Sequence, residues 1–168
     1  MHAQAPNRII TTLQAYPVGT VKSGFNGRTG WAQTDKGLRT LKNLELAYLK
    51  RGADFYGQFR LKSIYPKITL AGMSKIGYRE VYVLDLASSG QTERLYLDAK
   101  TYLPVRINTV LIMGGNPTPV EIYMDDWRDV DGLKYAFYMS QRFPQMTLSY
   151  TVKEIKHNEQ IDPKMFEP

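Results

Sequence analysis

YREVYVLDLASSGQTERLYLDAKTYLPVRINTV, residues 78–110, is the part of the chain from which its architecture is most clearly predicted. Val, Leu, Ile and Tyr, which favour β-strands, are concentrated in three segments of it, residues 81–86, 93–97 and 104–111. The first gap holds Ser88, Ser89 and Gly90, and the second begins at Asp98, whose side chain can bond to the backbone two residues on. We therefore predict three consecutive antiparallel strands.

The same pattern predicts further strands on both sides of this stretch. They are expected at residues 7–14, 18–25, 30–34, 67–75, 120–127, 133–142 and 146–156. Asn26-Gly27 is a dipeptide typical of a two-residue hairpin loop, and residues 113–117 are expected to form another turn. In the tail, Phe166 is the apolar residue expected to dock on the rest of the protein.

Helices are predicted in one insertion only. Apolar residues at helical spacing begin at Leu41, with Asn43 as the expected N-cap and Gly52 as the expected end. Residues 53–61 are expected to form a second helix, in which Phe55 and Phe59 would lie four residues apart on one side. With roughly nine or ten strands and so few helices, the predicted class is α+β, mainly β, with one large curved antiparallel sheet.

Composition excludes several classes of function. The chain has 168 residues, no cysteine and two histidines, His2 and His157, near opposite ends, so disulfides, thiolate catalysis and the usual zinc sites are not expected. No apolar run is long enough to cross a bilayer. The net charge of +6 is compatible with an anionic membrane surface or nucleic acid, but a solvated surface explains it better, and nucleic acid is not expected as a partner.

The sequence does not complete any of the calcium-binding, phosphate-binding or nucleophile motifs that it partly resembles. If Gly132 were the sixth residue of a calcium-binding EF-hand loop, Trp127 and Tyr138 would stand at coordinating positions, which neither can fill. Residues 24–30, GFNGRTG, lack the Lys-Ser/Thr ending of a phosphate-binding P-loop. With no nucleophile elbow and no central histidine, we predict no catalytic residue, no metal site and no cofactor, and expect the protein not to be an enzyme.

Three segments carry a family resemblance: RLYLDAKTYLPVR (94–106), EIYMDDWRDVDGLKYAFYMS (121–140) and KHNEQIDPKMFEP (156–168). Their shared pattern has an Asp-x-x-Thr turn, a Leu-Pro pair where the next strand begins, a Tyr-x-Asp strand end, an Asp-Gly turn and a closing Asn-x-x-Ile-Asp-x-x-x-Phe. In this pattern the chain resembles the LolA/LolB-like, or outer-membrane lipoprotein-sorting-like, superfamily. These motifs are mainly turn signatures and therefore indicate fold more strongly than function.

The resemblance implies an unclosed antiparallel β-barrel whose concave, apolar face is covered by one or two short helices and accepts acyl chains or a partner's hydrophobic segment. It implies one domain over residues 1–168 that lacks the family's first elements, in the periplasm or cell envelope. The open sheet edge left by the missing elements suggests a homodimer, and peripheral contact with a membrane is a further expectation.

The function predicted from this resemblance is a non-enzymatic binding module for a lipid, an acyl chain or a lipoprotein. Candidate residues of its apolar cavity are Trp31, Leu44, Phe55, Phe59, Tyr82, Leu84, Tyr123 and Phe137. Ordinary core packing is the competing explanation for each of them. The alternative function is a structural or interaction module of a larger envelope protein, with a core filled by its own side chains.

Overall fold

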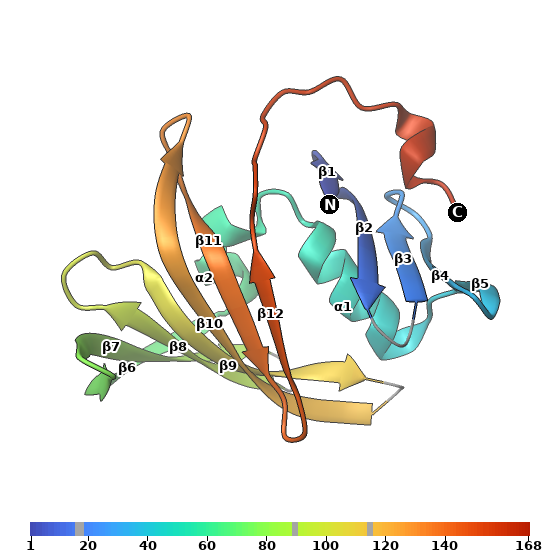
Figure 1. Ribbon diagram of the computed structural model, residues 1–168. Coiled ribbons are helices and arrows are strands. Elements are labelled where there is room, and N and C mark those ends of the chain that lie inside the picture. Colours follow the sequence, from blue (N-terminus) through green and yellow to red (C-terminus); the bar gives the residue numbers. More distant parts are fainter. Residues whose placement is uncertain (16–18, 89–90, 114–115) are drawn as a thin grey trace. The chain divides into compact units, whose positions relative to one another are not determined.

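The computed structural model describes all residues except 16–18, 89–90 and 114–115, and it divides into two compact units (Figure 1). The first unit comprises residues 1–61 and 159–168, and the second comprises residues 62–158. Both units are built on antiparallel sheets that do not close, and the helices are short and few. The predicted class, α+β and mainly β, is confirmed, although the strands are shared between two sheets.

The first sheet has five strands in the order β1-β2-β3-β4-β5. Their bounds are β1 His2–Gln4, β2 Arg8–Ala15, β3 Gly19–Phe25, β4 Gly30–Thr34 and β5 Gly37–Thr40. Helix α1 (Asn43–Ala53) and the 3-10 helix η1 (Gly57–Phe59) follow. Helix α1 packs closely on β4, because a Cβ atom placed on Gly30 would lie 2.7 Å from Cδ1 of Leu46.

The second sheet has seven strands in the order β12-β11-β10-β9-β8-β7-β6, so each strand pairs with its neighbours in sequence. Their bounds are β6 Lys67–Ile76, β7 Arg79–Ser88, β8 Gln91–Asp98, β9 Pro104–Met113, β10 Asn116–Val130, β11 Leu133–Arg142 and β12 Thr147–Thr151. Helix α2 (Leu61–Ile64) precedes β6, and the 3-10 helix η2 (Pro163–Phe166) lies in the tail. The three strands predicted within residues 78–110 are β7, β8 and β9.

Phe166 docks as expected and belongs to the core of the first unit. Its side chain is 0% exposed, and its backbone oxygen accepts a hydrogen bond of 2.9 Å from Nε1 of Trp31, which is also buried. Asn26 donates to the carboxylate of Glu167 at 2.8 Å. A Cβ atom on Gly24 would lie 2.7 Å from the Trp31 ring, so the absence of a side chain there makes room for the indole.

Several local predictions are wrong. Residues 26–29 form a four-residue loop between β3 and β4, closed by a bond from the Asn26 N–H to the Thr29 oxygen, and not a two-residue hairpin loop. Asn43 is the first residue of α1 with φ 50°, and Lys42 is the N-cap, with no side-chain cap bond. Gly52 lies within α1, which ends at Ala53.

The helix predicted at residues 53–61 is also not formed. The 3-10 helix η1 and the start of α2 take its place. Asn116 and Pro117, which were predicted to belong to a turn, are part of β10. The other predicted turn residues 114–115 lie outside the described residues. So do Ser89 and Gly90, between the first two strands predicted in residues 78–110, and Val18 of the strand predicted at residues 18–25.

The Asp98 turn forms as predicted. Oδ1 of Asp98 accepts hydrogen bonds of 2.9 Å from the backbone N–H groups of both Lys100 and Thr101. Because these bonds, the one from Thr101 first, favour the ionised carboxylate, they lower the pKa of Asp98 below its ordinary value. A group with a lowered folded-state pKa stabilises the protein above its unfolded-state pKa, and this stabilisation is lost as the pH falls through the folded-state pKa.

We therefore expect Asp98→Asn to make unfolding less sensitive to acid. The amide still accepts both bonds but does not titrate, so between about pH 5 and about pH 3 the drop in Tm should be about 1–2 °C smaller than in the unsubstituted protein. Calorimetry at both pH values measures this difference. Asp98→Ala, which removes the acceptor, should lower Tm at pH 5 as well, and an equal acid-induced drop in the Asn variant would contradict the assignment.

Candidate ligand-binding face

Strand register separates the second sheet into two faces of different character. Directly paired residues point to the same side, and Tyr82, Leu84 and Leu86 of β7 therefore define one face, as the alternation in the sequence predicts. The pairing carries this face across all strands of the sheet, and we call it the apolar face. From β6 to β12 it includes Ile68, Leu70, Met73, Tyr82, Leu84, Leu86, Leu95, Leu97, Ile107, Val120, Ile122, Met124, Phe137, Met139, Leu148 and Tyr150.

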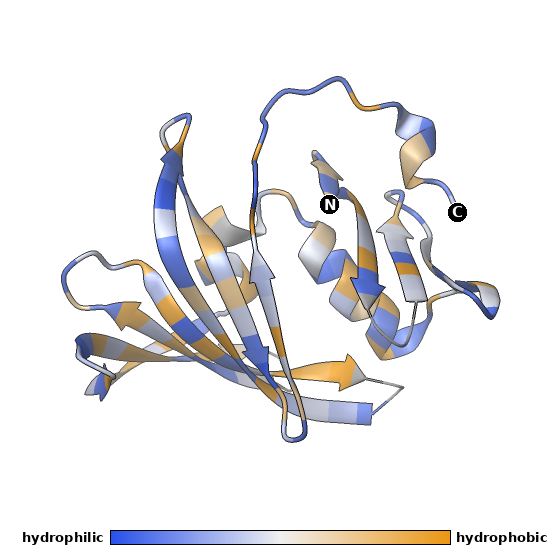
Figure 2. Ribbon diagram, in the orientation of Figure 1, coloured by the Kyte–Doolittle hydropathy of each residue, from blue (hydrophilic) through white to orange (hydrophobic). Residues whose placement is uncertain are grey.

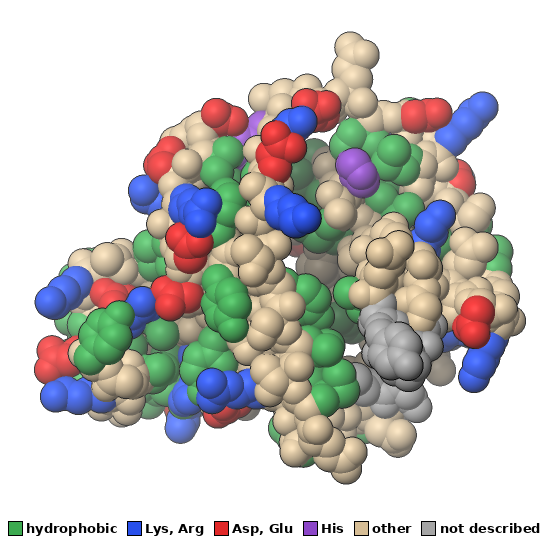
Figure 3. All heavy atoms as spheres, in the orientation of Figure 1, with side chains coloured by type: hydrophobic (Ala, Val, Ile, Leu, Met, Phe, Trp, Pro, Cys, Tyr) green, Lys and Arg blue, Asp and Glu red, His purple; other side chains and the backbone are tan. Residues whose placement is uncertain are grey.

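The apolar face is only partly buried. Leu86, Leu95, Val120 and Phe137 are buried, Leu70 and Met73 on the edge strand β6 are 60% and 58% exposed, and the other members are half-buried. Hydrophobic and polar residues alternate along the strands of the second sheet (Figure 2), and hydrophobic side chains reach the molecular surface between charged ones (Figure 3). Partial burial also raises the pKa of Tyr150 on this face.

Among the described residues of the apolar face, one charged side chain is buried. Glu93 of β8 is paired with Leu86 and is 1% exposed. Its carboxylate accepts hydrogen bonds from the hydroxyl of Tyr65 at 2.5 Å and from Oγ1 of Thr109 at 2.7 Å. Tyr65, which follows α2, is also buried. These bonds offset part of the cost of removing a carboxylate from water, and they hold the segment after α2 on the sheet.

The opposite face carries most of the charged side chains, and we call it the polar face. The Arg106 guanidinium lies 4.0 Å from the centre of the Tyr96 ring and donates to the Tyr123 hydroxyl at 3.1 Å. Arg94 is paired with Asp85, and the hydrogen bond between them lowers the pKa of that carboxyl. A bulge in β9 brings Val105 beside Tyr96 on this face.

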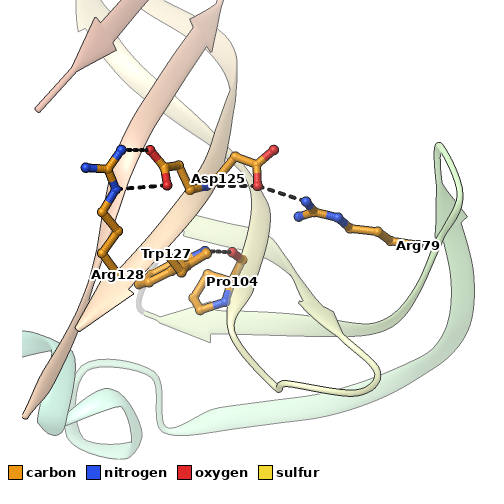
Figure 4. Close-up of polar contacts among 6 residues, drawn as sticks. Arg79, Pro104, Asp125, Trp127 and Arg128 are labelled. Carbon is orange, nitrogen blue, oxygen red and sulfur yellow. Dashed lines mark hydrogen bonds and ion pairs between the residues drawn. The ribbon is translucent and has the colours of Figure 1, made fainter.

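Ion pairs also tie strands of the polar face together, as Figure 4 shows for the neighbourhood of Trp127. Arg79 of β7 donates to Asp125 of β10 at 2.8 Å, and this bond lowers the pKa of the Asp125 carboxyl. The indole of Trp127 donates to the Pro104 oxygen at 3.0 Å. The polar face is thus cross-linked by its own side chains, which leaves the apolar face as the better candidate for binding.

The predicted cavity residues lie in different places. In the second unit, Tyr82, Leu84 and Phe137 belong to the apolar face, whereas Tyr123 pairs with Arg106 and Ser140 on the polar face. The remaining four belong to the first unit: Trp31 is buried beneath the tail, and Leu44, Phe55 and Phe59 are exposed. Sequence reasoning missed Glu93, although its spacing of two and four residues from Leu95 and Leu97 places it on their face.

Within the described part of the chain, no group of three or more His, Asp or Glu side chains is arranged to hold a metal ion. The described helices include none that is long and apolar enough to span a membrane.

Comparison with known proteins shows which solved structures have a similar fold. No protein-family model and no curated protein matches the sequence. Among similar solved structures, a LolA superfamily protein from Nitrosomonas europaea aligns with TM-score 0.59 and 11% identity over 99% of this chain and 79% of that one. A domain assigned as an outer-membrane lipoprotein-sorting protein from Vibrio parahaemolyticus aligns with TM-score 0.57 and 12% identity over 95% and 81%.

A DUF1329 family protein from Desulfovibrio piger aligns with TM-score 0.58 and 11% identity over 92% of this chain and 72% of that one. At these identities the likeness concerns the fold, and it extends over nearly the whole chain. The resemblance found in the sequence motifs is thereby confirmed at the level of structure: the protein has the fold of the LolA-like, outer-membrane lipoprotein-sorting-like proteins.

Proposed function

We propose that this protein is a non-enzymatic binding module of the cell envelope, which holds an acyl chain of a lipid or lipoprotein against the apolar face of the second sheet. The observation that carries the proposal is the apolar face itself, which spans every strand of the sheet and keeps side chains such as Leu70 and Met73 accessible. A face that served only as a core would have no reason to expose them.

The chemistry of the apolar face suits a hydrocarbon. Leu, Ile and Met side chains form most of it, and they offer dispersion contacts without demanding hydrogen-bond partners. Tyr82 adds an aromatic surface, stacked on Tyr102 with ring centres 6.1 Å apart. Burying such side chains against a ligand releases roughly 25 cal/mol for each Å² of apolar surface removed from water.

Similar structures support the same assignment. One is described as a lipoprotein-sorting protein and another as a LolA superfamily protein, and such names favour a carrier or binding role over catalysis. The description of one of them as an outer-membrane lipoprotein-sorting protein favours the periplasm as the compartment. In the proposed site, Tyr82, Leu84 and Phe137 are the members that the sequence had already indicated.

Titration with a fluorescent fatty-acid analogue, followed by displacement with phospholipid, tests the proposal. The matched variants lie on one strand. Leu70→Glu and Met73→Glu add a charge to the exposed edge of the apolar face, whereas Thr69→Glu and Ser74→Glu add the same charge to the polar face of β6. Since a buried Leu contributes about 1.5–3 kcal/mol, the first pair should weaken binding about tenfold or more, and the second pair less than about twofold.

Saturable, displaceable binding with this difference between the two pairs would support the carrier assignment. Equal effects of the two pairs of variants would place the ligand away from the apolar face. If the unsubstituted protein did not bind the fatty-acid analogue, the carrier assignment would be overturned. In that case a structural or interaction module, whose apolar face is covered by protein, becomes the better explanation.

A further inference from the structure

A small open cavity lies in the first unit, where the ends of several elements meet. Its volume is about 380 Å³, which is near the lower end for ligand sites. The cavity combines residues from the β1–β2 connection, the end of β3, the β3–β4 loop, α1 and the segment after α1. It is lined by Pro6, Asn7, Phe25, Gly27, Lys50, Asp54 and Arg60.

The acidic side chain of this cavity is already paired. Both carboxylate oxygens of Asp54 lie 2.6 Å from Nη2 of Arg60, and Oδ1 also accepts from the Tyr56 N–H at 3.2 Å. The charges of Asp54 and Arg60 therefore largely cancel within the cavity wall. Each of the two groups is held in place by the other.

The second cation has no such partner. Lys50, near the end of α1, forms no ion pair with the described residues, and its ammonium lies 5.8 Å from the centre of the buried Phe25 ring. A cation–π contact of an exposed lysine leaves most of its charge to solvent. With the Asp54–Arg60 pair neutral, the cavity carries one net positive charge.

The walls of the cavity are fixed before any ligand arrives. The Phe55 N–H donates to the Pro6 oxygen at 3.1 Å, which ties the end of α1 to the β1–β2 connection. Oδ1 of Asn26 accepts from the N–H groups of Arg28 and Thr29 at 2.9 and 2.8 Å, which orders the β3–β4 loop. Preorganised polar groups bind more tightly because less conformational entropy is lost on binding.

We infer that this cavity binds one oxyanion, a phosphate or carboxylate group, with its charge on the Lys50 ammonium. Asn7 lines the cavity with a side-chain amide, a group that carries two donors, and Arg60 adds a guanidinium whose geometry suits such oxygens. The group can belong to a free small molecule or to the headgroup of an anionic lipid. This inference concerns the first unit alone and does not depend on the acyl-chain proposal.

NMR titration of the isotope-labelled full chain separates these sources. Inorganic phosphate and butyrate test the free anion, and monomeric dihexanoyl phosphatidylglycerol tests the lipid headgroup, with dihexanoyl phosphatidylcholine as the zwitterionic comparison. Binding should shift the backbone amides of Asn7 and Gly27 and should weaken as NaCl is added. A phosphatidylglycerol response much stronger than that of phosphate identifies the headgroup as the source, and similar responses identify the free anion.

Two variants should change the affinity in opposite directions. Lys50→Gln should weaken binding about fivefold, and Asp54→Asn, which keeps an acceptor for Arg60, should strengthen it about threefold, because charge pairs at exposed sites contribute modestly. Lys36→Gln, in the β4–β5 turn, removes the same charge away from the cavity and should have less than a twofold effect. Thermal unfolding of each variant checks that the fold persists.

Equal weakening by Lys50→Gln and Lys36→Gln would show that only net charge matters and would overturn the site. Weaker binding by Asp54→Asn, or no shift at Asn7 and Gly27 with any probe, would do so as well. Failure here leaves the fatty-acid titration unaffected, and failure of that titration leaves this site unaffected.

Discussion

Replacing Phe166 by alanine should lower the free energy of unfolding of the first unit by about 3–5 kcal/mol, the usual cost of removing a buried phenyl ring. Its ring is fully buried, and the residue lies in the tail segment, residues 159–168, which belongs to the first unit. The Trp31 indole donates to the Phe166 oxygen, so loss of the ring also loosens the position of that acceptor. An undocked tail would also break this hydrogen bond and expose the Trp31 ring to water, which adds to the cost.

Urea denaturation followed by Trp31 fluorescence measures this effect in a Trp127→Phe background, which leaves one indole as reporter. The control is Met165→Ala in the same 3-10 helix, where the side chain is 42% exposed and should contribute less than about 1 kcal/mol. Similar losses for both variants would indicate that the helix, and not the phenyl ring, is what stabilises the unit. No loss for Phe166→Ala would contradict the packing described for the tail.

The second sheet could be predicted from sequence because local signals and tertiary packing agree there. β11 was expected at the bounds it has, Leu133–Arg142, since Gly132 and Pro144 punctuate it on both sides. In β7, the alternation placed Tyr82, Leu84 and Leu86 on one face and Val81 and Val83 on the other, as the pairing shows, because successive side chains of a strand point to opposite faces.

The segment after α1 could not be predicted, because its local pattern competes with specific polar contacts. Phe55 and Phe59 have helical spacing, but Phe55 contacts Tyr56 edge-on with ring centres 5.3 Å apart, and Phe59 is exposed. The Asp54 carboxylate accepts from the Tyr56 N–H and from Arg60, which stabilises a turn where a helix was expected. The spacing of apolar residues in the sequence does not reveal such side-chain contacts.

Glu93 shows a different limit of sequence reasoning. A glutamate at the start of a strand is ordinarily an exposed residue, and its two hydroxyl partners come from distant positions, Tyr65 before β6 and Thr109 in β9. Only the folded sheet brings the three together. Because Tyr65 and Glu93 are far apart in the sequence, the hydrogen bond between them joins the segment after α2 to β8, and its loss should therefore lower the stability of the second unit.

We expect Glu93→Ala to destabilise the second unit by about 3–5 kcal/mol, because it removes the charged member of a buried hydrogen-bonded group and leaves two hydroxyls without this acceptor. Tyr65→Phe, which removes one donor, should cost about 1.5–3 kcal/mol. The double variant should be more stable than the sum of the two losses predicts, with a coupling of about 1–3 kcal/mol.

Urea denaturation monitored by far-UV circular dichroism provides the four free energies of this cycle. Thr92→Ala, adjacent in β8 but exposed on the polar face, is the matched control and should lie within about 0.5 kcal/mol of the unsubstituted protein. Additive losses for Glu93→Ala and Tyr65→Phe would mean that the two side chains do not stabilise each other. A coupled cycle would instead show that the buried carboxylate fastens the segment after α2 to the sheet that carries the apolar face. Because Glu93 lies on that face, its hydrogen bonds then contribute to the stability of the surface on which the proposed ligand binds.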